Sequence, residues 1–310
     1  MKLSIIVAVY NQERYVERTI KSILCQNISC EYEVLIGEDC STDNTRSVLK
    51  GLESVCPSNY HFFYRKNNLG PSGNFNDLYK RMKGQYFLVI EGDDYFLYNL
   101  KLQEQIEFLD KNPEYIACAH NVLVVDENSK ERELEYPDCK KEEYSIFDYA
   151  NFVLPGQTAS ILARNYFKDA SIDKSILDVP YYAGDRRRAF FLICNGKIHC
   201  IQKKWSAYRY VTDSGSSFSA TIRDSIKTRE QDILFLKKSM EYARKNCGRV
   251  YQKNCEAMWI LALYGGYRKK VNQISIATIL LAYISCKYKL YIIKYLCSYF
   301  LNKKTRNVVH

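Results

Sequence analysis

The stretch SIIVAVYNQERYVERTIKSILCQ, residues 4–26, carries an apolar run straight into a helical pattern. Residues 3–9 are almost entirely apolar and rich in β-branched side chains, which is typical of a strand buried on both faces. Over residues 13–25 the apolar side chains recur at the three- and four-residue spacing of a helix. The amino terminus is therefore predicted to be a strand followed by a helix.

The same alternation continues along the chain. Further strands are predicted at residues 32–38, 60–64, 86–91, 115–120 and 122–126, and further helices at 41–54, 74–82 and 100–111. A Gly/Asn/Pro loop is expected at 67–73, and a charged surface excursion at 127–150. Strands that alternate with helices form a mostly parallel sheet with helices on both faces. The predicted fold class is therefore α/β, with a Rossmann-like central sheet.

Charge divides the chain into two regions. Residues 221–310 carry 18 Lys and Arg against 5 Asp and Glu, a net charge of +13, whereas the whole chain carries +10. The pattern of this last region is helical, so residues 1–220 are expected to form one domain and residues 221–310 a basic helical extension. An anionic partner is expected to meet the extension.

Cysteine usage and the amino terminus indicate a compartment. None of the 12 Cys forms a CxxC pair, and no Cys/His spacing resembles a zinc site. The first residues run into a strand without the apolar region and cleavage site of a signal peptide. Free thiols in a reducing cytosol are therefore expected.

Carboxylates follow two of the predicted buried strands, in residues 38–43 and 91–94. In open α/β sheets, ligands bind outside the carboxyl ends of the strands. A divalent cation that bridges a diphosphate would satisfy buried carboxylates, and one carboxylate could accept hydrogen bonds from a base or a ribose. The alternative is that both segments are polar turns whose acids cap the following helices.

Four stretches together resemble the inverting family 2 glycosyltransferases of the GT-A fold, of the type that builds bacterial surface polysaccharides. They are SIIVAVYNQERYVERTIKSILCQ (4–26), VLIGEDCSTDNT (34–45), NNLGPSGNFN (67–76) and GQYFLVIEGDDYF (84–96). The resemblance covers about residues 1–215. It implies a nucleotide-sugar-binding half at 1–120 and an acceptor half at 121–220, with a nucleotide-sugar donor and a glycan or lipid-linked acceptor.

The resemblance also implies roles for donor-binding residues. Ala8, Val9 and Tyr10 would lie against the nucleotide base, and Asp39 would read the edge of a uracil, so a UDP-sugar is expected. Here Glu38-Asp39-Cys40 stands where the family commonly has Asp-Asp-Gly.

Residues 91–94 stand at the place of the family's Asp-x-Asp motif. The resemblance implies that Asp93 ligates Mn²⁺ or Mg²⁺, that Glu91 touches the ribose, and that Asp94 orients the site or meets the donor sugar. Glu91 replaces the usual first Asp, and it reaches one methylene further, so the donor could differ from the commonest one.

Residues in the second half would complete the reaction. By resemblance, Asp185 is the general base that takes the acceptor's proton, Arg209 contacts the departing diphosphate, and His120, Gln157 and Thr158 lie on the acceptor side. The alternatives are an N-cap aspartate, an arginine with a structural role, and polar residues that only support the fold.

Other functions remain open at this stage. A nucleotidyltransferase also uses a doubly wound sheet and metal-binding acids, but the loop after the first strand lacks a Gly-rich basic signature. A nucleotide-sugar-binding scaffold without turnover would have lost acids that this chain keeps. No zinc finger, helix-turn-helix or aromatic-platform motif supports a nucleic-acid partner, which is therefore not expected.

The segment ISIATILLAYISCKYKLYIIKYLCSYFL, residues 274–301, is apolar and aromatic. Its uninterrupted apolar part, before Lys287, is shorter than the roughly 20 residues that span a bilayer. Lys287 and Lys294 would share one helical face, and cations flank the segment within residues 268–306. We expect a helix in the interface of an anionic membrane, which would hold a cytoplasmic protein at the inner face of the cell membrane. The alternatives are a helical subdomain or a dimer surface.

Overall fold

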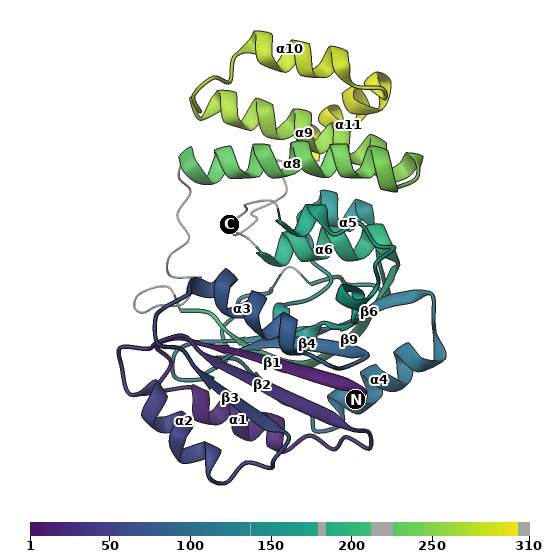
Figure 1. Cartoon of the computed structure of the whole chain (residues 1–310). Helices are drawn as coiled ribbons and strands as arrows, with labels where there is room; N and C mark the ends of the chain where they lie inside the picture. Colours follow the sequence, from purple (N-terminus) through teal and green to yellow (C-terminus); the bar gives the residue numbers. More distant parts are fainter. Residues whose placement is uncertain (137, 179–183, 212–225, 303–310) are drawn as a thin grey trace. The chain divides into compact units, whose positions relative to one another are not determined.

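The computed structural model describes residues 1–136, 138–178, 184–211 and 226–302, and Figure 1 labels its elements. The chain divides into two compact units. The first unit consists of Met1–Ser145, Val153–Ile172 and Asn195–Ile222, and the second of Ile146–Phe152, Asp173–Cys194 and Arg223–His310. Two internal segments therefore group with the carboxyl-terminal helices, in addition to the extension expected from residue 221.

The first unit is built on a nine-stranded sheet in the order β3-β2-β1-β4-β8-β6-β9-β5, with β7 paired to β9. The strands are β1 (Leu3–Val9), β2 (Tyr32–Glu38), β3 (Tyr60–Tyr64), β4 (Tyr86–Glu91), β5 (Tyr95–Phe96), β6 (Tyr115–Val125), β7 (Glu143–Tyr144), β8 (Leu162–Arg164) and β9 (Lys197–Arg209). Strands β3, β2, β1 and β4 are mutually parallel, as are β6 and β9, and β8 joins the two groups in the antiparallel sense. The predicted α/β class is confirmed.

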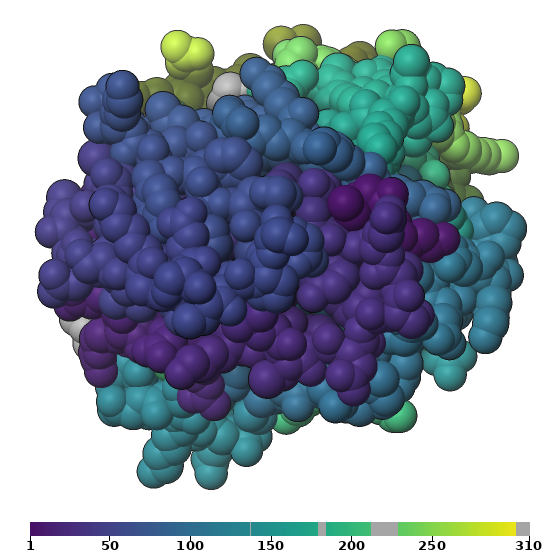
Figure 2. All heavy atoms as spheres, turned by 60° about the horizontal axis from the view of Figure 1, so that its bottom comes forward, coloured from purple at the N-terminus to yellow at the C-terminus, as the bar shows by residue number. Residues whose placement is uncertain are grey.

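Helices cover both faces of this sheet. They are α1 (Val16–Leu24), α2 (Thr45–Glu53), α3 (Gly70–Arg81) and α4 (Lys101–Lys111), and the short 3₁₀ helices η1 (Thr158–Ser160) and η2 (Tyr166–Lys168) lie further along the chain. Figure 1 shows α1 and α2 on one face and α3 on the other. Figure 2 turns the lower side of Figure 1 toward the reader. Residues from the amino-terminal part of the chain cover most of the surface seen in this view. Strand β1 is buried because helices lie on both sides of it, as its apolar run predicts.

The close approach of α3 to the sheet depends on a glycine. A Cβ added to Gly37 of β2 would lie 2.3 Å from Oδ1 of Asn74, so a larger residue would push the helix away. The amide of Asn74 donates to the Gly37 carbonyl at 2.8 Å, which fixes this helix on the strand.

Several predicted boundaries are corrected by local hydrogen bonds. Helix α3 begins at Gly70 and not at residue 74, because Asn68 Oδ1 accepts the Gly70 N–H at 2.8 Å and Pro71 suits the first turn. Helix α2 begins at Thr45, whose N–H is accepted by Asp43 Oδ1 at 3.0 Å, and not directly after Ser41. The two strands predicted at 115–126 form the single strand β6, with register irregularities at its middle. Residues 127–150 include β7 and a short helix.

The second unit is helical over its described residues, as the predicted carboxyl-terminal extension requires. It contains α5 (Ile146–Ala150), η3 (Ser175–Asp178), α6 (Gly184–Asn195), α8 (Ile226–Asn246), α9 (Arg249–Arg268), α10 (Ile276–Ser285) and α11 (Lys289–Asn302). Among the described residues, every helix falls short of the length and apolar content that crossing a membrane requires.

The prediction of a single helix within residues 274–301 is wrong, because α10 ends at Ser285 and a separate helix, α11, begins at Lys289. The buried carboxylate of Glu256 accepts the N–H groups of Lys287 and Tyr288, at 3.1 and 2.9 Å, and thereby caps the start of α11. Arg244 neutralises this carboxylate at 2.6 Å. Lys287 therefore lies between two helices and shares no helical face with Lys294.

Candidate active site

The parallel register brings three of the predicted segments to one edge of the sheet. Val9 stands opposite Glu38, and Ala8 stands opposite Glu91 on the other side. The main chain continues this pairing beyond the strands, since the Asp39 N–H donates to the Val9 carbonyl and the Gly92 N–H to the Ala8 carbonyl, both at 3.0 Å. The expected donor residues therefore lie together at the carboxyl ends of β1, β2 and β4.

Two buried acids lie at the end of β2. One is available to a ligand at this edge, and the other is engaged in contacts within the protein. Asp39 is buried, and its Oδ1 accepts the Leu69 N–H at 2.8 Å, while its second oxygen bonds to no described residue. Glu38 is also buried, but it accepts the Ser41 N–H at 2.5 Å and forms an ion pair with Arg46. The Glu that departs from the family pattern therefore pairs with the first turn of α2.

The end of β1 and the first residue after it are only partly exposed. Ala8 and Tyr10 are half-buried, whereas the Val9 side chain is packed in the hydrophobic core. Val9 can therefore present little beyond its main chain to a ligand, and Ala8 and Tyr10 offer the accessible side chains.

Glu91, Asp93 and Asp94 form a cluster in which one carboxylate oxygen of each lies within 4.8 Å of the others. Within the described part of the chain, this is the one group of acidic, His and Cys side chains close enough to share an ion. Burial raises the pKa of Asp93 to about 6, although the nearby Arg209 opposes the shift. Burial and the charges of Asp93 and Glu91 raise the pKa of Asp94 well above its usual range. Buried carboxylates that repel one another fit a hard divalent cation, which would remove the repulsion.

Asp94 is held by two segments that are distant in sequence. The Arg209 N–H donates to Oδ1 at 2.9 Å, and Gln157 Nε2 donates to Oδ2 at 2.7 Å. Gln157 is itself fixed because its Oε1 accepts the Ala159 N–H at 2.6 Å. The predicted residue Gln157 thus contacts the acidic cluster directly, and Thr158 follows it, half-buried, at the start of η1.

Two buried basic side chains lie within the same unit. His120 is fully buried, and its Nδ1 contacts the Asn121 carbonyl at 2.8 Å, while Nε2 has no hydrogen-bond partner among the described residues. Burial and the charge of Lys101 lower the pKa of His120 well below its usual range, so the ring is neutral at pH 7. Lys101 is fully buried too, and burial lowers its pKa well below the usual value.

Sequence analysis missed Lys101 and the network to which it belongs. Its Nζ donates to Gln105 Oε1 at 3.0 Å, and Gln105 Nε2 donates to the Ser160 carbonyl at 2.9 Å. Ser160 Oγ in turn donates to the Gln157 carbonyl at 2.7 Å. The sequence contained one signal for this network, because Lys101 and Gln105 lie four residues apart beside apolar positions of a predicted helix. Polar residues at that spacing usually face solvent, so the signal did not predict their burial.

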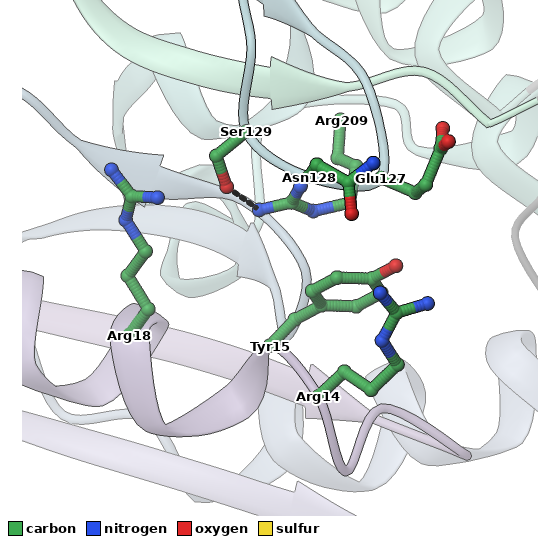
Figure 3. Close-up of a pocket in the computed structure, with 7 residues that line it drawn as sticks. All are labelled: Arg14, Tyr15, Arg18, Glu127, Asn128, Ser129 and Arg209. Carbon is green, nitrogen blue, oxygen red and sulfur yellow. Dashed lines mark hydrogen bonds between the residues drawn. The ribbon is translucent and has the colours of Figure 1, made fainter.

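Arg209 has a different environment from the one expected at a diphosphate. The side chain is 2% exposed, its Nε donates to the Asp93 carbonyl at 3.1 Å, and Nη1 donates to the Asp126 carbonyl at 2.6 Å. Nη2 donates to Ser129 Oγ at 3.0 Å, the contact drawn in Figure 3. Arg209 therefore braces the loop of the acidic cluster, and its contact with a diphosphate stays a prediction.

Asp185 belongs to the second unit, in the first turn of α6. It is partly exposed, and its Oδ1 accepts the Arg186 N–H at 2.7 Å. An acid in the first turn also interacts favourably with the helix dipole. The resemblance extends the motif of Asp185 over residues 182–187 and places residues 213–217 near the diphosphate, but residues 182–183 and 213–217 lie outside the described residues. The role of Asp185 as a base stays a prediction.

Comparison with known proteins adds family and fold. The family model described as Glycosyl transferase family 2 matches residues 4–170. The uncharacterized protein Rv1520 of Mycobacterium tuberculosis is 28% identical over 210 residues, which are 67% of this chain and 58% of that protein. A Campylobacter jejuni protein, named GalNAc(5)-diNAcBac-PP-undecaprenol beta-1,3-glucosyltransferase, is 23% identical over 264 residues, 85% of this chain and 82% of its own. This chain therefore spans little more than half of the mycobacterial relative.

Among solved structures, S. aureus TarS 1-349 in complex with UDP-GlcNAc superposes with a TM-score of 0.66 at 17% identity, over 99% of this chain and 93% of that chain. At this level of identity the match bears on the fold alone. The predicted GT-A fold is confirmed.

Proposed function

Because the chain belongs to glycosyltransferase family 2, we propose that it moves a sugar from a nucleotide-diphosphate donor, a UDP-sugar, onto an acceptor hydroxyl with inversion. The acceptor is a glycan or a lipid-linked glycan in cell-surface polysaccharide biosynthesis, in keeping with the name of the Campylobacter relative. The observation that carries the proposal is the cluster of Glu91, Asp93 and Asp94 at the strand edge that also holds Asp39. A diphosphate and a pyrimidine are the ligands that such an edge can bind together.

The base and the ribose would lie along the ends of β1 and β2. Ala8 and Tyr10 offer accessible side chains, and Val9 its main chain. Asp39 has one carboxylate oxygen that bonds to no described residue, and this oxygen can accept the N–H of a uracil. Glu91 is partly exposed beside Asp93 and would accept a ribose hydroxyl or share the cation.

A divalent cation, Mn²⁺ or Mg²⁺, would be held mainly by Asp93, because both oxygens of Asp94 already accept hydrogen bonds. Bound there, the cation would neutralise the charge that develops on the departing diphosphate. Asp94 would orient the loop, and Gln157, with Thr158 beside it, would present that loop to the acceptor side.

Inverting transfer needs a group that accepts the proton of the attacking hydroxyl. We assign this role to Asp185, whose carboxylate is partly exposed at the start of α6. His120 is a weaker choice, because it is fully buried.

The carboxyl-terminal helices would bind an anionic membrane surface at the inner face of the cell membrane. Exposed apolar side chains gather on α10 and α11, and Leu281 and Leu290 are 68% and 78% exposed. The chain has no acidic residue after Glu256, whereas it has six Lys and Arg between residues 268 and 302; the cations at 303–306 lie outside the described residues. Apolar side chains framed by cations suit an anionic bilayer better than a second copy of the same basic surface.

The experiment is a panel of UDP-sugars and GDP-sugars, with and without Mn²⁺, assayed for release of the nucleoside diphosphate. Metal-dependent release of UDP supports the proposal. A nucleotidyltransferase would instead release pyrophosphate when it is given a nucleoside triphosphate and a sugar phosphate in a parallel assay. Donor binding without release would indicate a scaffold.

A further inference from the structure

A cavity of about 250 Å³ lies in the first unit beside the loop of the acidic cluster. Three arginines line it, Arg14, Arg18 and Arg209, together with Tyr15 and the turn of residues 127–129. Figure 3 shows the Arg209 guanidinium above the Tyr15 ring, with Arg14 reaching from the turn before α1 and Arg18 from α1 itself. None of the proposed donor residues except Arg209 belongs to this lining.

The charge of the cavity is unbalanced. Arg14 and Arg18 are exposed and form no ion pair with any described residue. Glu127 is the single acid among the lining residues, so three cations face one carboxylate. Such a cavity attracts an anion with more than one negative charge.

Two of the three guanidinium groups lie against aromatic rings before a ligand arrives. The Arg209 guanidinium carbon lies 4.1 Å from the Tyr15 ring centroid, in addition to its three hydrogen bonds. The Arg18 guanidinium carbon lies 3.6 Å from the centroid of Tyr95. Stacked guanidinium groups lose less freedom on binding, and their planar fork matches the oxygens of a phosphate.

The size and the remaining lining indicate the rest of the ligand. Complete small-molecule sites occupy roughly 300–1,000 Å³, so the cavity takes one group of a larger molecule and not a whole nucleotide sugar. Glu127, Asn128 and Ser129 add a carboxylate, an amide and a hydroxyl, the groups that hydrogen-bond to sugar hydroxyls.

We propose that this cavity binds a phosphate group carried by the acceptor substrate, with the attached sugar against residues 127–129. The inference rests on the proposed function. The donor groups lie at the ends of β1, β2 and β4, whereas the cavity is formed by the start of α1, the turn of residues 127–129 and the end of β9. The two meet at the Asp93 carbonyl, which accepts from Arg209, so an acceptor anchored here would lie beside the donor.

The test uses the full chain, with inorganic phosphate as the probe. Binding of phosphate is measured by ³¹P NMR in the presence of Mg²⁺. Saturating UDP fills the donor site first, so that phosphate cannot bind there. Phosphate is expected to bind without displacing UDP, and Arg14→Ala combined with Arg18→Ala is expected to weaken phosphate binding by about tenfold or more while UDP affinity is kept.

The matched control is Lys21→Ala, which removes an exposed cation from the same helix, one paired only with Glu17. It should leave phosphate binding unchanged, and thermal melts should show that all variants fold. Displacement of phosphate by UDP would assign the cavity to the donor and overturn the proposal, as would wild-type phosphate affinity in the double variant. If UDP itself does not bind, the proposed function fails, whereas the phosphate titration still reports on the cavity.

Discussion

Gln157 Nε2 donates a 2.7 Å hydrogen bond to Asp94 Oδ2 across 63 residues of sequence, and both side chains are buried. The Arg209 N–H holds the other oxygen of the same carboxylate. Asp94 therefore owes its orientation to Gln157 and Arg209, and the acidic cluster depends on residues that are remote from its own loop.

Replacing Gln157 tests this dependence. Gln157→Ala removes one of the two partners of a buried carboxylate, and we expect a loss of about 1–3 kcal/mol in the free energy of unfolding together with slower UDP release. Urea denaturation and the release assay measure the two effects. Gln85→Ala removes an exposed amide, and it should cost less than about 0.5 kcal/mol. Equal effects of the two variants would contradict the role given to Gln157.

Asp93 carries the predicted metal dependence. Asp93→Ala is expected to abolish metal-dependent binding of UDP, because the remaining acids cannot hold the cation on the diphosphate. Calorimetric titration of UDP with and without Mn²⁺ measures this. Glu17→Ala removes an exposed carboxylate of α1 that pairs with Lys21, and it should leave UDP binding intact. Full turnover of the wild type in excess chelator would refute the metal requirement.

Asp185 is predicted to be the general base. Asp185→Asn keeps the shape and a capping oxygen but cannot accept a proton at neutral pH, so turnover should fall by at least about 10²-fold. Folding and UDP affinity should stay near those of the wild type. Asp178→Asn changes an exposed acid of the same unit and serves as the control. If turnover is unchanged in the Asp185 variant, another group is the base.

Asp138 makes stability depend on pH. Burial raises its pKa to about 7, and although Oδ2 accepts the Val122 N–H, Oδ1 has no partner in the part of the chain that the structure describes. The folded state binds this proton more tightly than the unfolded state, so the contribution of Asp138 is present below about pH 4 and is lost as the pH rises to about 7.

Asp138→Asn removes this titration. We expect the variant to be more stable than the wild type at pH 8 and to lose less stability between pH 5 and pH 8, by up to about 1.4 kcal/mol per pH unit. Urea denaturation across this range measures it. The exposed Glu135→Gln should follow the wild-type curve, and an identical pH slope in the Asp138 variant would disprove the assignment.

The apolar surface of α10 and α11 predicts membrane binding. Leu281→Glu combined with Ile284→Glu places charge on two side chains that are 68% and 64% exposed, so the fold should be kept while flotation with anionic vesicles is lost. Leu234→Glu alters a 43% exposed leucine of α8 and should still float. If the wild type never floats with such vesicles at low salt, the surface has another use.

Local sequence pattern predicted the strands and helices of the first 120 residues, apart from β5 and several boundaries, and the sheet edge at which the acids meet. The apolar run of β1 and the helical spacing of α1 encode burial through residues that are neighbours in the chain. Because parallel strands end at a common edge, the acids after β2 and β4 could be brought together without coordinates.

Pairings between distant residues came from the three-dimensional arrangement alone. The contact of Gln157 with Asp94, the burial of Lys101, and the break that Glu256 makes before α11 follow from how the sheet and the helices pack. A polar residue has the same local pattern whether it faces water or a buried partner. The cost of burying it is met by a hydrogen bond from a segment tens of residues away, and no periodicity in the chain records that bond.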